Sequence, residues 1–373
     1  MSTVTDLKLY AYQVLLIDLN SLKVPELKTI ASVLGKENNK LIKAKLIEYV
    51  KCIAYMVYND KPMKSITKPS SLPLVPEYCK LHDFNGNWRQ HLVEHGWATV
   101  KIPNFDSVAA VQGFLQMLHK FCPSFDPNNT NTWYPDNMPP NFRGVFTHYV
   151  GHEEWIWKVR EACYPIFSQI WQTNDLLTSF DGCCLLHGTY NNHKNWLHCD
   201  QGRLYRNMCC IQGLVNLLDN GPHDGGLVLI PKSRDYFSEY LDDHMEQGWD
   251  GFYPIDYDDH RVKQSKVVKV CGNAGEIFLW DSRIFHCNVP PVNHNSVRMC
   301  TYVCMLPTVN ATPDIIQKRI KFYEEGRMTS HWPYGEFFRD NGKHPHNRGK
   351  QVIKIEQPVI AELNPLRSKL IGY

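Results

Sequence analysis

The sequence of 373 residues contains no run of about eighteen apolar residues, so no ordinary membrane-spanning helix and no membrane partner are expected. No basic-then-apolar segment opens the chain, which argues against a secretory signal. The tripeptide Ser368 to Leu370 resembles a peroxisomal address, but three residues follow it and such signals are read only at the C-terminus. We therefore expect an intracellular protein, either cytoplasmic or nuclear.

The chain also has little excess of positive over negative charge. The formal net charge of +2 is too small to indicate a nucleic-acid partner for the whole chain. The thirteen cysteines include no Cys-x-x-Cys, and the adjacent pairs Cys183-Cys184 and Cys209-Cys210 would alternate faces in a strand. These features favour reduced, buried thiols and argue against a framework of disulfides or a cysteine zinc site.

The composition suits a packed globular protein, since 43% of the residues are hydrophobic and 12% are aromatic. The length allows one large core and a small module. Residues 61–76 are rich in Lys, Pro and Ser, as in an extended linker. We expect a helical module at residues 1–58, a linker at 59–80 and the main domain at 81–373.

Within the N-terminal module, residues 20–51 keep helical apolar spacing on both sides of a polar break at 35–39. The spacing predicts two short helices, and the stretch is similar to a SAP module, a small helix-loop-helix unit often associated with DNA. The stretch contains five lysines whose positive charge could bind phosphates: Lys36, Lys40, Lys43, Lys45 and Lys51. DNA is one possible partner, and a solvated face or protein docking is equally admissible.

The main domain begins with helical patterns and continues with strand-like ones. Apolar spacing predicts helices over residues 108–121 and 153–171, and Pro165 is expected to kink or split the second. From Phe180 onward, short apolar runs alternate with Gly, Asn, Asp and Pro clusters, which favours antiparallel strands.

A candidate metal site lies among these strands. His198 and Asp200 are two residues apart, so in an extended strand their side chains point the same way. His286 follows the apolar run 277–280 and is the natural third ligand. Two imidazoles and one carboxylate on one side of a metal leave the opposite positions open, which is the arrangement of non-haem Fe(II) oxygenases.

Arg298 lies twelve residues after His286, beyond Pro290 and Pro291, and we expect it on the next strand beside the metal. Its planar guanidinium can bind a carboxylate through two parallel hydrogen bonds. The distal carboxylate of 2-oxoglutarate requires such a partner.

The order and spacing of these motifs resemble the phytanoyl-CoA dioxygenase family of Fe(II)/2-oxoglutarate oxygenases over about residues 82–307. The matching segments are 94–103, 198–201, 224–233, 274–278, 282–286 and Arg298. The resemblance implies a double-stranded β-helix, the jelly-roll barrel, with helices flanking a mainly β domain. It also implies Fe(II), 2-oxoglutarate and O2 as cofactor and co-substrates, and hydroxylation of a C–H bond with release of succinate and CO2.

Further co-substrate contacts are less sharply defined. Gln212 and Asn216 share one face of an apolar strand, where buried amides need partners and could bond 2-oxoglutarate, although a solvated sheet face explains them equally well. Asn288 lies on the same side as His286 by parity and is a better candidate. Residues 322–350 are interpreted as a lid or surface extension.

Three functions are compatible with these motifs. The first is a hydroxylase of an unidentified substrate, and Asp200 argues against halogenation, which needs that position vacated. The second is a nucleic-acid-associated oxygenase tethered through residues 20–51. The third is a catalytically inactive binding protein on the same fold, which would be expected to have lost a ligand or Arg298. The sequence keeps all three predicted ligands and Arg298.

Overall fold

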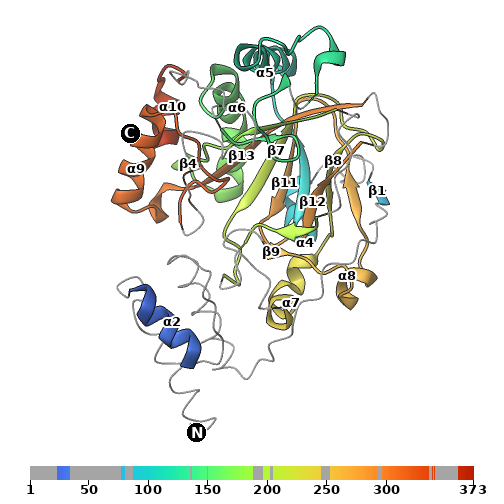
Figure 1. The fold of residues 1–373 in the computed structure, drawn as a ribbon, viewed down its shortest axis with the longest axis vertical. Coiled ribbons are helices and arrows are strands. Elements are labelled where there is room, and N and C mark those ends of the chain that lie inside the picture. Colours follow the sequence, from blue (N-terminus) through green and yellow to red (C-terminus); the bar gives the residue numbers. More distant parts are fainter. Residues whose placement is uncertain are drawn as a thin grey trace.

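The computed structural model describes part of the chain, and the account of the fold below refers to that part (Figure 1). The described residues are 23–33, 77–79, 87–134, 137–148, 150–187, 196–201, 205–244, 253–291, 296–335, 338, 340 and 360–373. Within them, no helix combines the length and the apolar character needed to cross a bilayer.

Two β-sheets form the centre of the molecule (Figure 1). The larger has the strand order β2-β11-β7-β13-β5-β3, with β4 also pairing with β13. Its strands are β2 (Trp97–Lys101), β3 (Val145–Phe146), β4 (Leu176–Thr178), β5 (Cys183–His187), β7 (Ile211–Asn216), β11 (Glu276–Asp281) and β13 (Val297–Pro307). The smaller has the order β1-β10-β8-β12-β6-β9. Its strands are β1 (Glu77–Cys79), β6 (His198–Cys199), β8 (Gly226–Leu229), β9 (Tyr253–Pro254), β10 (Val268–Val270) and β12 (His286–Val289).

The chain passes between the two sheets as it does in a jelly roll. Strands β5, β7, β11 and β13 belong to the larger sheet, whereas β6, β8, β10 and β12 belong to the smaller one. All pairings are antiparallel except that of β1 with β10. This order is that of a double-stranded β-helix. The predicted fold class, mainly β with flanking helices, is confirmed.

Side-chain alternation separates the barrel interior from its outer layers. On β7, β11 and β13, residues such as Leu214, Phe278 and Cys300 face the smaller sheet and pack with Leu229 and Val270. The intervening residues of these strands face the helices. Both faces are therefore buried, which explains why the central strands read as nearly continuous apolar runs.

Helices cover the outer face of the larger sheet (Figure 1). They are α5 (Ser107–Phe121), α6 (Glu154–Trp171), α9 (Pro313–Glu324) and α10 (Pro365–Ile371), while α4 (Trp88–His95) leads into β2. The two predicted helices correspond to α5 and α6. Of the two outcomes expected at Pro165, the split is wrong, because α6 runs through it, and the kink stays a prediction. Buried Val159 and Cys163 before the proline and Phe167 after it are anchored in one core, and that packing outweighs the lost backbone hydrogen bond.

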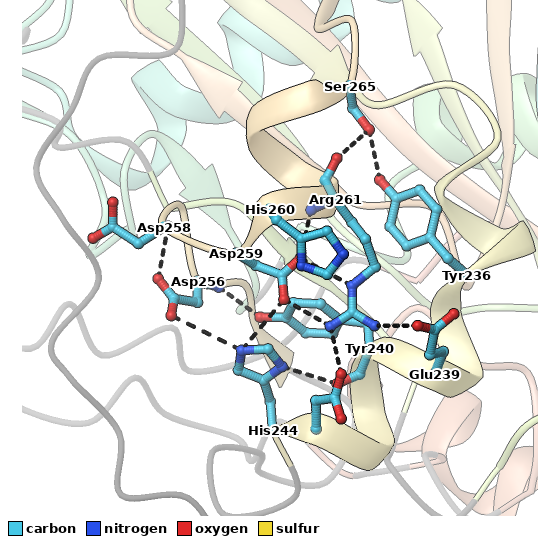
Figure 2. A network of polar contacts seen from close by, with 11 residues as sticks. Tyr236, Glu239, Tyr240, His244, Asp256, Asp258, Asp259, His260, Arg261 and Ser265 are labelled. Carbon is cyan, nitrogen blue, oxygen red and sulfur yellow. Dashed lines mark hydrogen bonds and ion pairs between the residues drawn. The ribbon is translucent and has the colours of Figure 1, made fainter.

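The outer face of the smaller sheet is covered by two short helices, α7 (Phe237–Asp243) and α8 (His260–Gln264). A polar network centred on Arg261 joins them (Figure 2). The Arg261 guanidinium donates to both carboxylate oxygens of Asp259, at 2.9 and 2.7 Å, and to Asp243 at 2.9 Å. It also pairs with Glu239 at 3.3 Å, and the His244 imidazole lies 3.6 Å from Asp259.

Arg261→Ala is expected to lower the free energy of unfolding by about 3 kcal/mol, because it leaves the buried Asp259 carboxylate without its cation. Thermal unfolding followed by circular dichroism measures the effect as a lower Tm. Lys263→Ala is the matched control, since its ion pair with Asp258 is exposed and should change stability by less than about 1 kcal/mol. Equal losses in both variants would contradict a structural role for the network.

In the N-terminal region the structure describes one helix, α2 (Val24–Val33), inside the stretch where the first helix was predicted. Leu27 and Ile30 on that helix are buried. The predicted second helix, the five lysines, residues 59–76 of the predicted linker and the expected start of the main domain near residue 81 lie outside the described residues. Glu77–Cys79, inside the predicted linker, form strand β1 of the smaller sheet. The SAP-like resemblance and the domain boundaries therefore stay predictions.

Candidate metal centre and co-substrate pocket

Three potential ligands meet where β6 and β12 lie side by side in the smaller sheet. His198 pairs directly with His286 across these antiparallel strands, and Asp200 follows β6 immediately. One ligand atom from each residue lies within 4.8 Å of the other two, and all three residues are buried. Among the described residues this is the one cluster of His, Cys, Asp and Glu with metal-binding geometry.

The backbone fixes how the two imidazoles are presented. His198 Nδ1 lies 2.9 Å from the Trp196 carbonyl, and His286 Nδ1 lies 2.9 Å from the Ile284 carbonyl. Each carbonyl accepts a hydrogen bond, so the proton resides on Nδ1 and the Nε2 lone pair is available for a metal. Burial lowers the pKa of His198, which favours the neutral imidazole that ligation requires.

The carboxylate between them is held ionised. Asp200 Oδ1 lies 3.4 Å from His198 Nε2, and Oδ2 lies 3.2 Å from His286 Nε2. Gln212 on β7 donates from Nε2 to Asp200 Oδ2 at 2.9 Å. Burial alone would raise the pKa of Asp200, but the neighbouring imidazoles, that of His331 foremost, hold this pKa well below its usual range.

The triad opens onto a cavity of about 470 Å³ between the two sheets. That volume is typical of small-molecule sites. Its lining is mainly apolar and aromatic, with a few polar groups. The residues are Phe142, Val145, Thr147, Asp181, Trp196, His198, Asp200, Gln212, Gly213, Leu214, Leu227, Trp280, His286, Asn288, Tyr302, Cys304, Ser330 and His331.

Arg298 lies on β13, as expected, and is 1% exposed. Its Nη1 donates to the Cys184 sulfur at 3.6 Å, whereas Nε and Nη2 are buried without a hydrogen-bond partner. No Asp or Glu of the described part of the chain forms an ion pair with it. The Tyr302 side chain lies beside the guanidinium and lines the cavity, and the Tyr302 hydroxyl accepts from Asn288 Nδ2 at 3.4 Å. A buried, incompletely paired guanidinium calls for an anion.

The three amides predicted as co-substrate contacts have different positions. Asn288 lines the cavity two residues after His286. Gln212 also lines it, but its donor group is engaged by Asp200. Asn216 is fully buried beside Cys300, outside the cavity lining, and both of its amide atoms lack a partner. The solvated sheet face considered for Gln212 and Asn216 is wrong, since both are buried.

Sequence reasoning did not assign five polar residues of the cavity to the site: Thr147, Asp181, Tyr302, Ser330 and His331. Strand parity could have found Tyr302, because it lies four residues after Arg298 and therefore on the same face of the strand. No local signal marks Asp181 or His331, which come from segments 150 residues apart in the chain.

These residues fit an iron centre with a bound 2-oxo acid. Two neutral imidazoles and a carboxylate form a facial ligand set, and Arg298 supplies an unneutralised cation at a buried position next to the cavity. A barrel with this set defines the class of mononuclear non-haem iron oxygenases.

Comparison with known proteins narrows the class. Residues 136–288 match the family model described as Phytanoyl-CoA dioxygenase (PhyH), and this segment includes all three triad residues. The segment that carries the triad is thus similar to the phytanoyl-CoA dioxygenase family. The protein is an enzyme, an oxygenase that uses iron and 2-oxoglutarate.

Similar proteins include "Ava biosynthesis cluster protein O" of Aspergillus versicolor, which is 27% identical over 298 residues, covering 73% of this chain and 96% of the relative. Among solved structures, AviO1 from Streptomyces viridochromogenes Tue57 shares 17% identity with a TM-score of 0.41, over 63% of this chain and 99% of that one. EctD from S. alaskensis shares 13% identity with a TM-score of 0.38, over 65% and 84%.

Proposed function

We propose that this oxygenase hydroxylates a C–H bond of a small, largely apolar molecule, with release of succinate and CO2. His198, Asp200 and His286 hold the iron, and Arg298 binds the distal carboxylate of 2-oxoglutarate. The observation that carries the proposal is the buried guanidinium of Arg298, which has no carboxylate partner among the described residues and lies beside a cavity containing a complete ligand triad.

When bound, the iron and 2-oxoglutarate supply the oxidising chemistry. The chain supplies position and shielding. The Trp196 and Ile284 carbonyls orient the two imidazoles, and Gln212 holds the carboxylate. The buried cavity walls, including Trp280 and Leu227, keep water away from the reacting centre.

The co-substrate is held along one wall of the cavity. Asn288 and Tyr302 line that wall between the triad and Arg298, so their amide and hydroxyl are placed to donate to the 2-oxoglutarate carboxylate. Asn216 is a more distant candidate, because its unpartnered amide is buried outside the cavity lining.

A small-molecule substrate is favoured by the cavity itself, which is lined mainly by aliphatic and aromatic side chains rather than by basic ones. The relative from Aspergillus versicolor is named for a biosynthesis cluster, which agrees with this class. A DNA tether through residues 20–51, and the division into residues 1–58, 59–80 and 81–373, stay predictions. The complete triad argues against an inactive binding protein.

Succinate release is the direct test. Purified protein supplied with Fe(II), 2-oxoglutarate and O2 should release succinate slowly even without the primary substrate, and chelation of the metal should stop it. Anaerobic equilibrium dialysis should show metal-dependent binding of one 2-oxoglutarate per chain. A protein that binds iron but not 2-oxoglutarate would contradict the proposal.

Gln212→Ala is expected to weaken metal binding by about 10- to 100-fold, because the Asp200 carboxylate loses the hydrogen bond that orients it. Titration with manganese(II), followed by electron paramagnetic resonance, measures the affinity. Gln212→Glu should be at least as harmful, since it sets a second carboxylate against Asp200. Wild-type affinity in both variants would show that Gln212 does not orient the ligand.

A further inference from the structure

The guanidinium of Arg298 is held at one corner by the neighbouring strand β5. Its Nη1 donates to the Cys184 sulfur at 3.6 Å. Cys184 lies directly opposite Cys300 of β13, and both side chains pack in the barrel interior. Arg298 is two residues before Cys300 on β13, so its side chain leaves the strand on the same face. The contact therefore joins two neighbouring strands inside the barrel.

The other donors of this guanidinium form one edge of the planar group. Nη1 is the nitrogen on the side of Cδ, so Nε–H and Nη2 point together to the opposite edge. Both atoms are buried without a hydrogen-bond partner. Two adjacent N–H groups in one plane match the two oxygens of a carboxylate. The Cys184 contact thus occupies the one nitrogen that a carboxylate bound to this edge does not need.

The sulfur of Cys184 suits this task in both of its protonation states. A thiol and a thiolate each carry lone pairs, so the sulfur can accept from Nη1 in either form. Without a fixed partner, a long arginine side chain can turn about its terminal bonds, and that freedom is lost when a ligand binds. A contact that fixes the guanidinium in advance lowers this entropic cost.

A second buried cation lies near Arg298 but is already engaged. Lys269 Nζ donates to Asn220 Oδ1 at 2.6 Å and to the Val270 carbonyl at 2.9 Å. By contrast, the cavity-lining Tyr302 side chain lies beside the Arg298 guanidinium. The orientation of Arg298 is therefore the property that matters for an anion entering from the cavity.

We propose that Cys184 is a positioning residue for co-substrate binding: its sulfur fixes Arg298 so that the Nε and Nη2 edge receives the distal carboxylate of 2-oxoglutarate. This inference rests on the proposed function and deepens it, because it assigns the orientation of Arg298 to a named contact. Cys184 itself touches neither the co-substrate nor the metal in this proposal.

Two 2-oxo acids serve as probes. 2-Oxopentanoate has the same carbon chain as 2-oxoglutarate, with a methyl group in place of the distal carboxylate. Their dissociation constants are measured by equilibrium dialysis on the full chain loaded with manganese(II) under nitrogen. The wild type is expected to prefer 2-oxoglutarate by at least about a hundredfold, because only this acid can pair with the buried guanidinium.

Cys184→Val and Cys184→Ala should each lower this preference by about tenfold, since each removes a hydrogen bond to a charged group. The loss should fall on 2-oxoglutarate alone, with the affinities for 2-oxopentanoate and manganese(II) within about threefold of wild type, because neither depends on Arg298. Cys184→Val keeps a branched apolar side chain that suits a strand, which guards against a variant that does not fold. Cys184→Ser keeps an acceptor and should retain more of the preference than Cys184→Ala.

Cys183→Ala is the matched control. Cys183 is the preceding residue of β5 and is also fully buried, but its side chain packs on the opposite face, against the helices. Its loss should leave the preference within about threefold of wild type.

Arg298→Ala tests the proposed function separately and should abolish the preference. If Arg298→Ala keeps the preference, the proposed role of Arg298 fails and the inference fails with it. If Arg298→Ala loses the preference while folded Cys184→Val and Cys184→Ala keep it, the inference alone is overturned. Tighter binding of 2-oxoglutarate to the Cys184 variants also overturns it, because the sulfur would then compete with the co-substrate for the guanidinium.

Discussion

Asp200→Ala is expected to abolish iron-dependent succinate release while leaving the fold intact. The carboxylate lies between the two imidazoles, 3.4 Å from His198 Nε2 and 3.2 Å from His286 Nε2, and is the single anionic member of the set. Removing it should weaken metal binding by more than about a hundredfold, beyond the effect of changing an outer hydrogen bond. Succinate release and manganese(II) titration measure the two consequences.

His198→Ala should give a loss of the same order, because it also removes one of three protein ligands. His260→Ala is the control, since that histidine is exposed on α8 and far from the cavity lining. Circular dichroism must show that each variant is folded. Turnover like that of the wild type in a folded Asp200→Ala or His198→Ala variant would remove that residue from the triad.

Arg298→Ala should raise the concentration of 2-oxoglutarate needed for half-maximal succinate release by roughly a hundredfold to a few thousandfold. Loss of one partner of a buried ion pair costs about 3–5 kcal/mol, and each 1.4 kcal/mol is a factor of ten. Metal affinity should be nearly unchanged, because Arg298 makes no contact with a triad ligand among its recorded hydrogen bonds. A 2-oxoglutarate titration, with metal affinity measured in parallel, tests the assignment.

Arg283 is the matched control. It lies in the turn between β11 and β12, three residues before His286. Its guanidinium is already paired with Asp281, at 2.9 Å from Nε and 2.6 Å from Nη2. It is also absent from the cavity lining. Arg283→Ala should therefore leave the 2-oxoglutarate requirement within about threefold of wild type. The opposite ranking of the two variants would assign the co-substrate carboxylate to Arg283.

The triad and Arg298 could be predicted because their signals are local. Side chains two residues apart in an extended strand point the same way, which predicted that His198 and Asp200 act together. The order of the motifs along the chain then indicated His286 as the third ligand and Arg298 as the co-substrate residue. The same parity rule put Gln212 and Asn216 on one face of a strand but left open whether that face is interior or solvated, and it could not tell that the Gln212 amide bonds to Asp200. That contact joins β7 of the larger sheet to the residue after β6 of the smaller sheet, so it depends on how the two sheets face each other, which no local pattern encodes.

By itself, the sequence determined the ligand types, their spacing and the alternation of buried strands, since these follow from backbone geometry and residue chemistry. Only the tertiary structure decided which long-range segments meet at the cavity. His331 and Asp181 both line the cavity, and buried Arg319 ties their segments together by binding the carbonyls of Pro333 and Thr178. Backbone carbonyls exist at every residue, so the sequence does not reveal which of them a buried guanidinium will bind.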